Sequence, residues 1–200
     1  MIKIGIDVGS TTAKLVAVDE NDNLLFSKYE RHNAKAKETI LSFLKELLSE
    51  IGDKDISVRI TGSIGMGISE KCSLPFVQEV VAAAKAIQKD YSHVTSMIDI
   101  GGEDAKVVFF KDAEATDLRM NGNCAGGTGA FIDQMAIILG VNIDELNQLA
   151  MNATQVYPIA SRCGVFCKTD IQNLIAKNVS RENIAASIFR AVAVQTVVTL

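Results

Sequence analysis

The sequence predicts an α/β protein with two similar subdomains, and two observations lead to this prediction. Residues 6–16 align without gaps on residues 98–108, and six of the eleven positions are identical. In both copies an apolar strand ends in Asp-x-Gly, a short turn follows, and a second apolar strand returns. The offset of 92 residues is too long for a solenoid repeat and indicates a duplicated subdomain. We expect the subdomains to span residues 1–93 and 94–200.

The first half of the chain alternates strand and helix patterns. Residues 20–23 (Glu-Asn-Asp-Asn) separate two apolar runs, which is typical of a hairpin turn. Gly52 ends a segment with the apolar spacing of an amphipathic helix, and Pro75 precedes another helical segment. The expected elements are strands at residues 14–19, 24–29 and 56–60 and helices at residues 38–51 and 76–89.

The second half repeats the strand pattern to about Met120 and then becomes helical. The last segment is mostly apolar, which predicts a buried helix. It reaches Leu200 without a cap, turn or polar tail, so we expect a truncated C-terminus. The expected helices are residues 127–139, 143–151, 169–177 and 181–200.

Composition excludes several classes of function. A net charge of −4 and a pI near 5.2 give no basic surface for nucleic acid or an anionic membrane. Two histidines are too few for a histidine-rich metal site. The N-terminus lacks the pattern of a signal peptide and no long apolar run spans a bilayer, so we expect a cytoplasmic protein. Its four cysteines then indicate metal ligation, catalysis or burial rather than disulfides.

The first Asp-x-Gly turn has the composition of a phosphate-binding loop. Gly9 lets the backbone approach a phosphate, while backbone N–H groups and the hydroxyls of Ser10, Thr11 and Thr12 supply donors. Asp7 ends the preceding strand, where a carboxylate is able to hold Mg²⁺ beside substrate phosphates.

The second turn repeats this arrangement with Asp99, Gly101, Gly102 and Glu103. Each turn alone is better explained as a tight turn that ends a strand. The gapless duplication favours the phosphate interpretation, in which two loops facing one another across a cleft clamp the phosphates of one nucleotide.

Both loops resemble the phosphate motifs of the acetate and sugar kinase/Hsp70/actin superfamily. Within it, the chain closely resembles the activators of 2-hydroxyacyl-CoA dehydratases and the related ATPase subunits of benzoyl-CoA reductase. The combination of motifs is specific, because the first loop alone would indicate only the superfamily. The matching stretches are GIDVGSTTAK at 5–14, TGSIG at 61–65, QEV at 78–80, DIGGED at 99–104, NCAGGTGAF at 123–131 and SRCGVF at 161–166.

The resemblance implies an actin-like ATPase fold of two ribonuclease-H-like subdomains around an ATP cleft. It implies that Asp7, Asp99 and Glu103 organise Mg²⁺ and the attacking water. Glu79 matches an acidic position of the family near the cleft, and we assign Lys14, whose repeat partner is Lys106, to nucleotide binding as well. Members usually continue into a Gly-Gly-rich adenosine loop that does not occur before residue 200, and we expect a fragment of a longer protein.

The cysteines distinguish this interpretation from a plain kinase. Cys124 and Cys163 each lie in a loop before an expected helix, where the helix dipole stabilises a thiolate. A 4Fe–4S cluster needs about four thiolates, which two chains related by a two-fold axis would supply. In the family a cluster does bridge the dimer through these two cysteines. Cys167 is the less favoured alternative ligand, and Cys72 is interpreted as a loop or core residue.

The resemblance implies an ATP-dependent activator that drives low-potential electrons into a CoA-ester dehydratase or reductase. Its partners are then a second copy of the chain, that enzyme, and ferredoxin or flavodoxin as electron donor. Two alternatives stay open. One is a sugar or acid kinase of the same superfamily, with Asp99 as general base, although no substrate-binding insertion is evident. The other is a non-redox, actin-like nucleotide switch.

Overall fold

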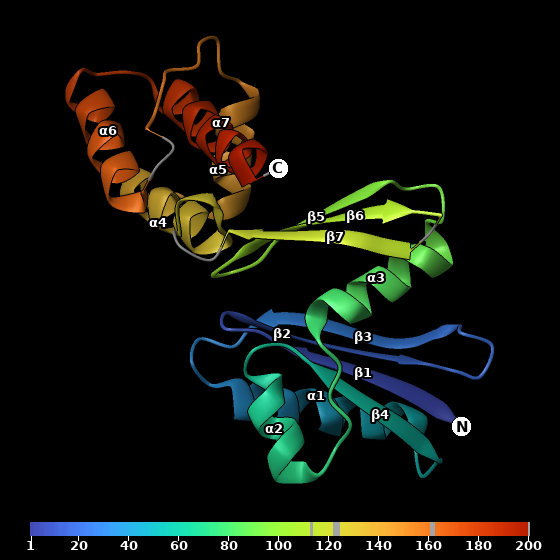
Figure 1. Ribbon diagram of the computed structural model, residues 1–200. Coiled ribbons are helices and arrows are strands. Elements are labelled where there is room, and N and C mark those ends of the chain that lie inside the picture. The colour runs from blue at the N-terminus through green and yellow to red at the C-terminus, as the bar shows by residue number, and fades with distance from the viewer. Residues whose placement is uncertain (113, 122–124, 161–162, 200) are drawn as a thin grey trace. The chain divides into compact units, whose positions relative to one another are not determined.

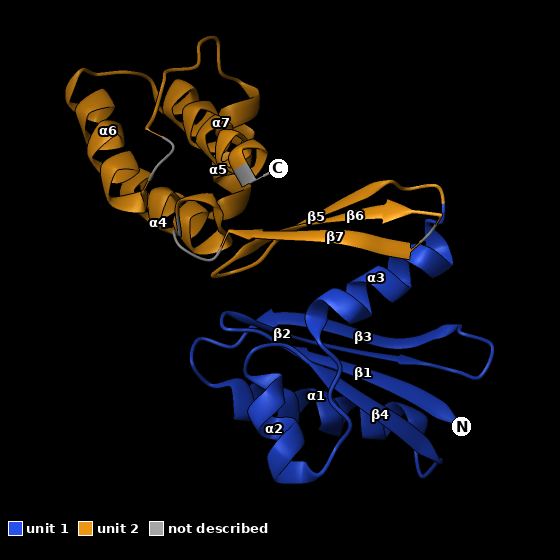
Figure 2. Cartoon of the chain, viewed as in Figure 1, with its two compact units in different colours: residues 1–92 blue, residues 93–200 orange. Residues whose placement is uncertain are grey.

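The computed structural model describes residues 1–112, 114–121, 125–160 and 163–199. The chain divides into two units, Met1–Ser92 and His93–Leu200 (Figure 2). Among the described residues, no helix combines the length and apolar character needed to cross a membrane.

Unit 1 contains a four-stranded sheet with the order β3-β2-β1-β4 (Figure 1). β1 pairs antiparallel with β2 and parallel with β4, and β2 pairs antiparallel with β3. The hairpin between β2 and β3 turns at residues 19–23, close to the expected turn. The strands are β1 Ile2–Val8, β2 Thr12–Val18, β3 Leu24–Arg31 and β4 Ile56–Thr61.

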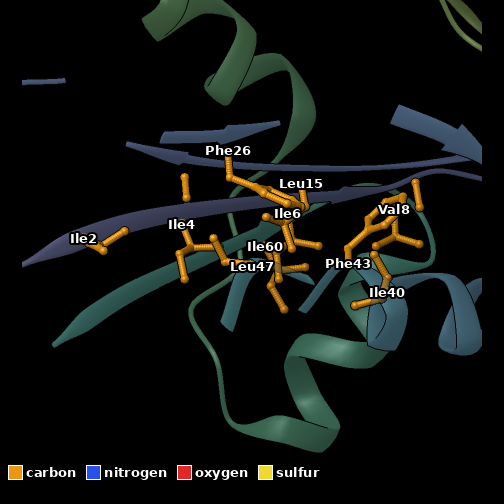
Figure 3. Close-up of a cluster of buried hydrophobic side chains, with 12 residues drawn as sticks. Ile2, Ile4, Ile6, Val8, Leu15, Phe26, Ile40, Phe43, Leu47 and Ile60 are labelled. Atoms are coloured by element: carbon orange, nitrogen blue, oxygen red, sulfur yellow. The ribbon is translucent and has the colours of Figure 1, made fainter. Parts of the chain in front are cut away.

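Helix α1 (Ala36–Ile51) covers one face of this sheet. Alternate residues of β1 point into the core, as the twofold period of a strand requires. They meet Ile40, Phe43 and Leu47, which recur at helical spacing on one side of α1 (Figure 3). The other residues of β1, Asp7 among them, therefore lie on the opposite face of the sheet.

Two further helices complete unit 1, α2 (Gly65–Cys72) and α3 (Glu79–Asp90). The expected helix at 76–89 starts three residues late because the preceding residues extend beside β4. There Val77 N–H donates to Ile60 O at 2.8 Å, and Ile60 N–H donates to Pro75 O at 3.0 Å.

Unit 2 begins with an antiparallel sheet of order β5-β6-β7. The central strand carries the buried side chains Ala105, Val107, Val108 and Phe110. The strands are β5 Ser96–Ile100, β6 Ala105–Lys111 and β7 Glu114–Asn121.

The remainder of unit 2 is helical and has its own core. One buried cluster draws on each α-helix described in this unit and contains Phe131, Met135, Leu146, Ile171 and Ile188. The helix expected at 169–177 begins five residues earlier, directly after Cys163. The elements are a 3-10 helix at Ala125–Gly127, α4 Gly129–Leu139, α5 Ile143–Met151, α6 Gly164–Ala176 and α7 Arg181–Thr199.

Candidate functional site

The first candidate phosphate loop is a tight turn between β1 and β2. Gly9 N–H donates to Thr12 O at 3.0 Å and closes the turn. Ser10 and Thr11 occupy its tip and are partly exposed. In the described part of the chain, Ser10 N–H has no hydrogen-bond acceptor. The loop therefore offers a peptide donor and two hydroxyls at the end of the sheet.

The second candidate loop repeats this turn in unit 2. Gly101 N–H donates to Asp104 O at 2.9 Å, the same bond displaced by 92 residues. Gly102 N–H, like that of Ser10, has no acceptor among the described residues. The sequence repeat thus corresponds to a repeat of loop geometry.

The N-terminus of helix α4 holds the second loop through two backbone hydrogen bonds. Gly129 N–H donates to Gly101 O at 2.8 Å, and Ala130 N–H donates to Gly102 O at 3.0 Å. A Cβ on Gly129 would lie 3.2 Å from Gly101 O, so the absence of a side chain permits this close approach. The first N–H groups of a helix have no partner within the helix, and here two of them bind the loop.

Asp7 lies at the end of β1 beside Lys14, its cross-strand neighbour on β2. Lys14 Nζ donates to Asp7 Oδ2 at 2.8 Å and lies 5.4 Å from the centre of the Tyr29 ring. Thr61, on β4, is the neighbour of Asp7 in the parallel pair of strands. The Thr61 hydroxyl and Asp7 Oδ1 are both buried and have no hydrogen-bond partner in the described ranges. Two adjacent oxygens that lack donors are suited to a cation or a water molecule.

This face of the unit 1 sheet is hollowed. A pocket of about 460 Å³ is lined in part by Asp7 and Lys14. Glu79 is the first residue of α3 and is not among the residues that line the pocket. The other lining residues come from three strands and the α3 region: Gly5, Ile6, Val16, Arg59, Ile60, Thr61, Val77 and Ala82.

Asp99 has the same strand position as Asp7 but a different environment. It pairs with Lys106 in the sheet register, yet Lys106 Nζ donates to Asp104 Oδ1 at 3.0 Å. Within the described residues, the half-buried Asp99 forms no hydrogen bond or ion pair. Glu103, at the loop tip, is exposed. Among the described residues, Asp99 and Glu103 of the second loop therefore have no lysine partner.

Of the two expected cluster ligands, Cys163 is described and Cys124 lies outside the described residues. Cys163 is the N-cap of α6, is partly buried, and its thiol makes no hydrogen bond in the described part of the chain. Cys167, one turn later, is 1% exposed and donates from Sγ to Ala160 O at 2.6 Å. Cys72 is exposed in unit 1. The described residues contain no group of three or more potential metal ligands.

Sequence reasoning missed His32, which lies behind the first loop. Its ring donates from Nε2 to Gly9 O at 3.0 Å, and the side chain is 4% exposed. No motif marks this residue. The hairpin register could have identified it, because an antiparallel pairing of Thr12 with Arg31 places the next residue, His32, opposite Thr11 of the loop.

Comparison with known proteins decides the family. The model of the BadF/BadG/BcrA/BcrD ATPase family matches residues 4–199. The chain belongs to this ATPase family. This family member is 31% identical over 206 aligned positions to the 2-hydroxyisocaproyl-CoA dehydratase activator of Clostridioides difficile, an alignment that covers 96% of this chain and 73% of the relative. The resemblance to activators is confirmed.

Two solved structures have the same fold as this family member. Component A of the Acidaminococcus fermentans (R)-2-hydroxyglutaryl-CoA dehydratase has a TM-score of 0.90 at 28% identity, covering 100% of this chain and 77% of that one. The activator of the Clostridium difficile 2-hydroxyisocaproyl-CoA dehydratase, solved with bound ADPNP, has a TM-score of 0.88 at 29% identity, covering 99% and 74%. The expected actin-like ATPase fold is therefore confirmed.

Proposed function

We propose that the chain is an ATP-hydrolysing activator that drives electrons from a 4Fe–4S cluster into a CoA-ester dehydratase or reductase. One observation carries the proposal: a chain of which 96% aligns with a dehydratase activator contains the same loop twice, closed at Gly9 and Gly101 by bonds of 3.0 and 2.9 Å. The N–H groups of Ser10 and Gly102 have no acceptor among the described residues. Turns with such donors bind phosphate oxygens.

The carboxylates at these loops fit Mg²⁺, which prefers carboxylate and phosphate oxygens. Asp7 Oδ1 is a buried oxygen without a partner in the described residues, and Asp99 forms no ion pair there. We assign Asp7, Asp99 and Glu103 to organising Mg²⁺ and the attacking water, and the ion would neutralise charge on the phosphates. Lys14 keeps Asp7 oriented through Oδ2 and leaves Oδ1 for the ion or its water.

Asp99 has the less engaged carboxylate of the two aspartates, which favours it as the group that acts on the attacking water. In hydrolysis the water oxygen bonds to the γ-phosphorus, the bond from that phosphorus to ADP breaks, and a water proton passes to a base. Asp7 already accepts a hydrogen bond from Lys14, whereas Asp99 accepts none in the described part of the chain. We therefore assign water positioning and proton acceptance to Asp99.

Cys163 is suited to a cluster because it combines a free thiol with the N-terminus of α6. A 4Fe–4S cluster would supply one-electron transfer and needs about four thiolates, which Cys124 and Cys163 of two chains provide. Cys167 is less suitable, since its thiol is buried and bonded to Ala160 O. ATP would shift the dimer between two states that differ in electron transfer, with ferredoxin or flavodoxin as donor.

Substitution of either aspartate tests the assignment. We expect Asp7→Ala or Asp99→Ala to lower the rate of ATP hydrolysis by about 100-fold or more, because each removes an organising carboxylate. Iron content should stay at the wild-type level, since the cysteines lie in other segments. Asp112→Ala, in an exposed turn, is the control. Phosphate release and iron are measured on the same anaerobic samples, and a variant that loses iron but hydrolyses ATP normally would contradict the assignment.

A further inference from the structure

We propose that His32 is a positioning residue of the first phosphate loop, which holds the Gly9–Ser10 peptide so that Ser10 N–H is presented to a phosphate. The inference rests on the proposed nucleotide function and deepens it. It starts from two bonds. His32 Nε2 donates to Gly9 O at 3.0 Å, and His32 backbone N–H donates to Thr11 O at 3.2 Å. One residue thus holds two carbonyl groups of the loop.

The bond to Gly9 fixes the direction of a phosphate donor. In a trans peptide the C=O and the following N–H point in opposite directions. Because the carbonyl of Gly9 points at the His32 ring, the N–H of Ser10 points away from it. This N–H has no acceptor in the described part of the chain. The loop therefore keeps this donor directed away from the His32 ring, so the peptide does not need to reorient when a ligand binds.

The second loop supports this interpretation independently. Gly101 is the repeat equivalent of Gly9, and its carbonyl is also held, by the N–H of Gly129 at 2.8 Å. Gly102 N–H is correspondingly free among the described residues. The anchors differ, a helix N–H in unit 2 and a histidine ring in unit 1. The same carbonyl is anchored in both copies, which indicates that the anchor serves the loop.

The histidine environment defines which ring atom acts. A carbonyl only accepts, so Nε2 carries the proton of the neutral ring and Nδ1 does not. Nδ1 is buried and has no partner in the described ranges. One ring N–H, at Nε2, is therefore the functional group. Glutamine has an amide N–H at nearly the same distance from the backbone, whereas phenylalanine fills the space without a donor.

The test compares His32→Phe and His32→Gln in the full chain, with His93→Phe at the exposed second histidine as control. Calorimetry measures the Kd of Mg-ATP and of Mg-pyrophosphate. We expect His32→Phe to raise both constants by about tenfold, the equivalent of one lost hydrogen bond. His32→Gln should stay within about threefold of the wild type, and His93→Phe should match it.

Three results would overturn the inference. The first is that His32→Phe binds both probes as tightly as the wild type. The second is that His32→Gln binds as weakly as His32→Phe, which would indicate that the ring contributes packing alone. If His32→Phe fails to fold, His32→Asn takes its place, since its shorter amide does not reach Gly9 O, and the third result is then equal binding by the Gln and Asn variants. A wild type that binds neither probe would instead contradict the proposed function, and the inference with it.

Discussion

Asp22 lies in the turn between β2 and β3 and binds lysines from two other segments of unit 1. Lys3 Nζ and Lys89 Nζ donate to its two oxygens at 2.9 and 2.7 Å. The hydrogen bonds from Lys3 and then Lys89, with their positive charges, lower the pKa of Asp22 from 3.8 to about 2. This carboxylate joins β1 to the last turn of α3.

The lowered pKa predicts an acid-dependent contribution to stability. Because the folded-state pKa is below the unfolded value, the contribution is present above about pH 4 and is lost as the pH falls towards 2. We expect Asp22→Asn to lower the Tm at pH 6 and to match the wild type near pH 2, as measured by thermal scans across this range. Asparagine tolerates the positive φ of 64° at this position.

Asp112→Asn is the matched control. Asp112 is also a turn aspartate with positive φ, 53°, and it forms no ion pair with the described residues. Its substitution should leave the pH dependence of the Tm unchanged. Equal Tm differences for Asp22→Asn at pH 6 and pH 2 would show that the lysine contacts do not stabilise the fold.

At the same residue scale, the repeat has a lysine across the sheet from each aspartate, but the sequence did not predict which carboxylate each lysine binds. Lys14 and Lys106 are identical in the repeat, yet Lys14 binds Asp7 while Lys106 binds Asp104. The difference arises because the first copy has Thr12 where the second has Asp104. A carboxylate two residues away is able to draw the lysine from its cross-strand aspartate, which a comparison of motifs alone does not reveal.

At the scale of elements, the connection between β4 and α2 depends on one glycine. Gly62 has a φ of 96°, and a Cβ there would lie 2.3 Å from Val8 O. The chain turns tightly against the end of β1, where Ile64 N–H donates to the same oxygen at 2.9 Å. Val8 immediately precedes the first loop, so this turn supports the candidate site.

We predict that Gly62→Ala lowers the free energy of unfolding by about 2–5 kcal/mol, through backbone strain and contact with Val8. Gly67→Ala is the control, because Gly67 lies exposed within α2 and a Cβ there would have no described atom within 4 Å. It should raise the stability by about 0.5–1 kcal/mol, since alanine favours a helix over glycine. Urea unfolding measures both, and an unchanged midpoint for Gly62→Ala would refute the steric argument.

Elements with a strong apolar period were predictable, and those set by tertiary contacts were not. Helix α1 was expected at 38–51 and spans Ala36–Ile51, because its buried side recurs every three or four residues. Helix α2 was not anticipated, since two glycines and several polar residues weaken its pattern. Helix α6 was expected to begin at Thr169; instead it begins at Gly164, beside Phe131 of the core.

At the scale of the whole molecule, the duplication was the most informative signal in the sequence. A gapless repeat predicted two related units, and both Asp-x-Gly turns close with equivalent bonds. The family followed from motifs spread along the chain, and the match over residues 4–199 agrees with it. The cluster is a property of two chains, because its four thiolates would come from a dimer, and the fold of a single chain does not determine it.

The central claim is that this ATPase shares one 4Fe–4S cluster between two chains. The number of iron atoms bound per chain tests this claim most directly. Purified without oxygen, the wild type should contain about two iron atoms per chain, absorb near 400 nm, and have the mass of two chains. Cys124→Ser or Cys163→Ser should remove the iron, whereas Cys72→Ser and Cys167→Ser should retain it. An iron-free wild type, or about four iron atoms in a single chain, would contradict the account.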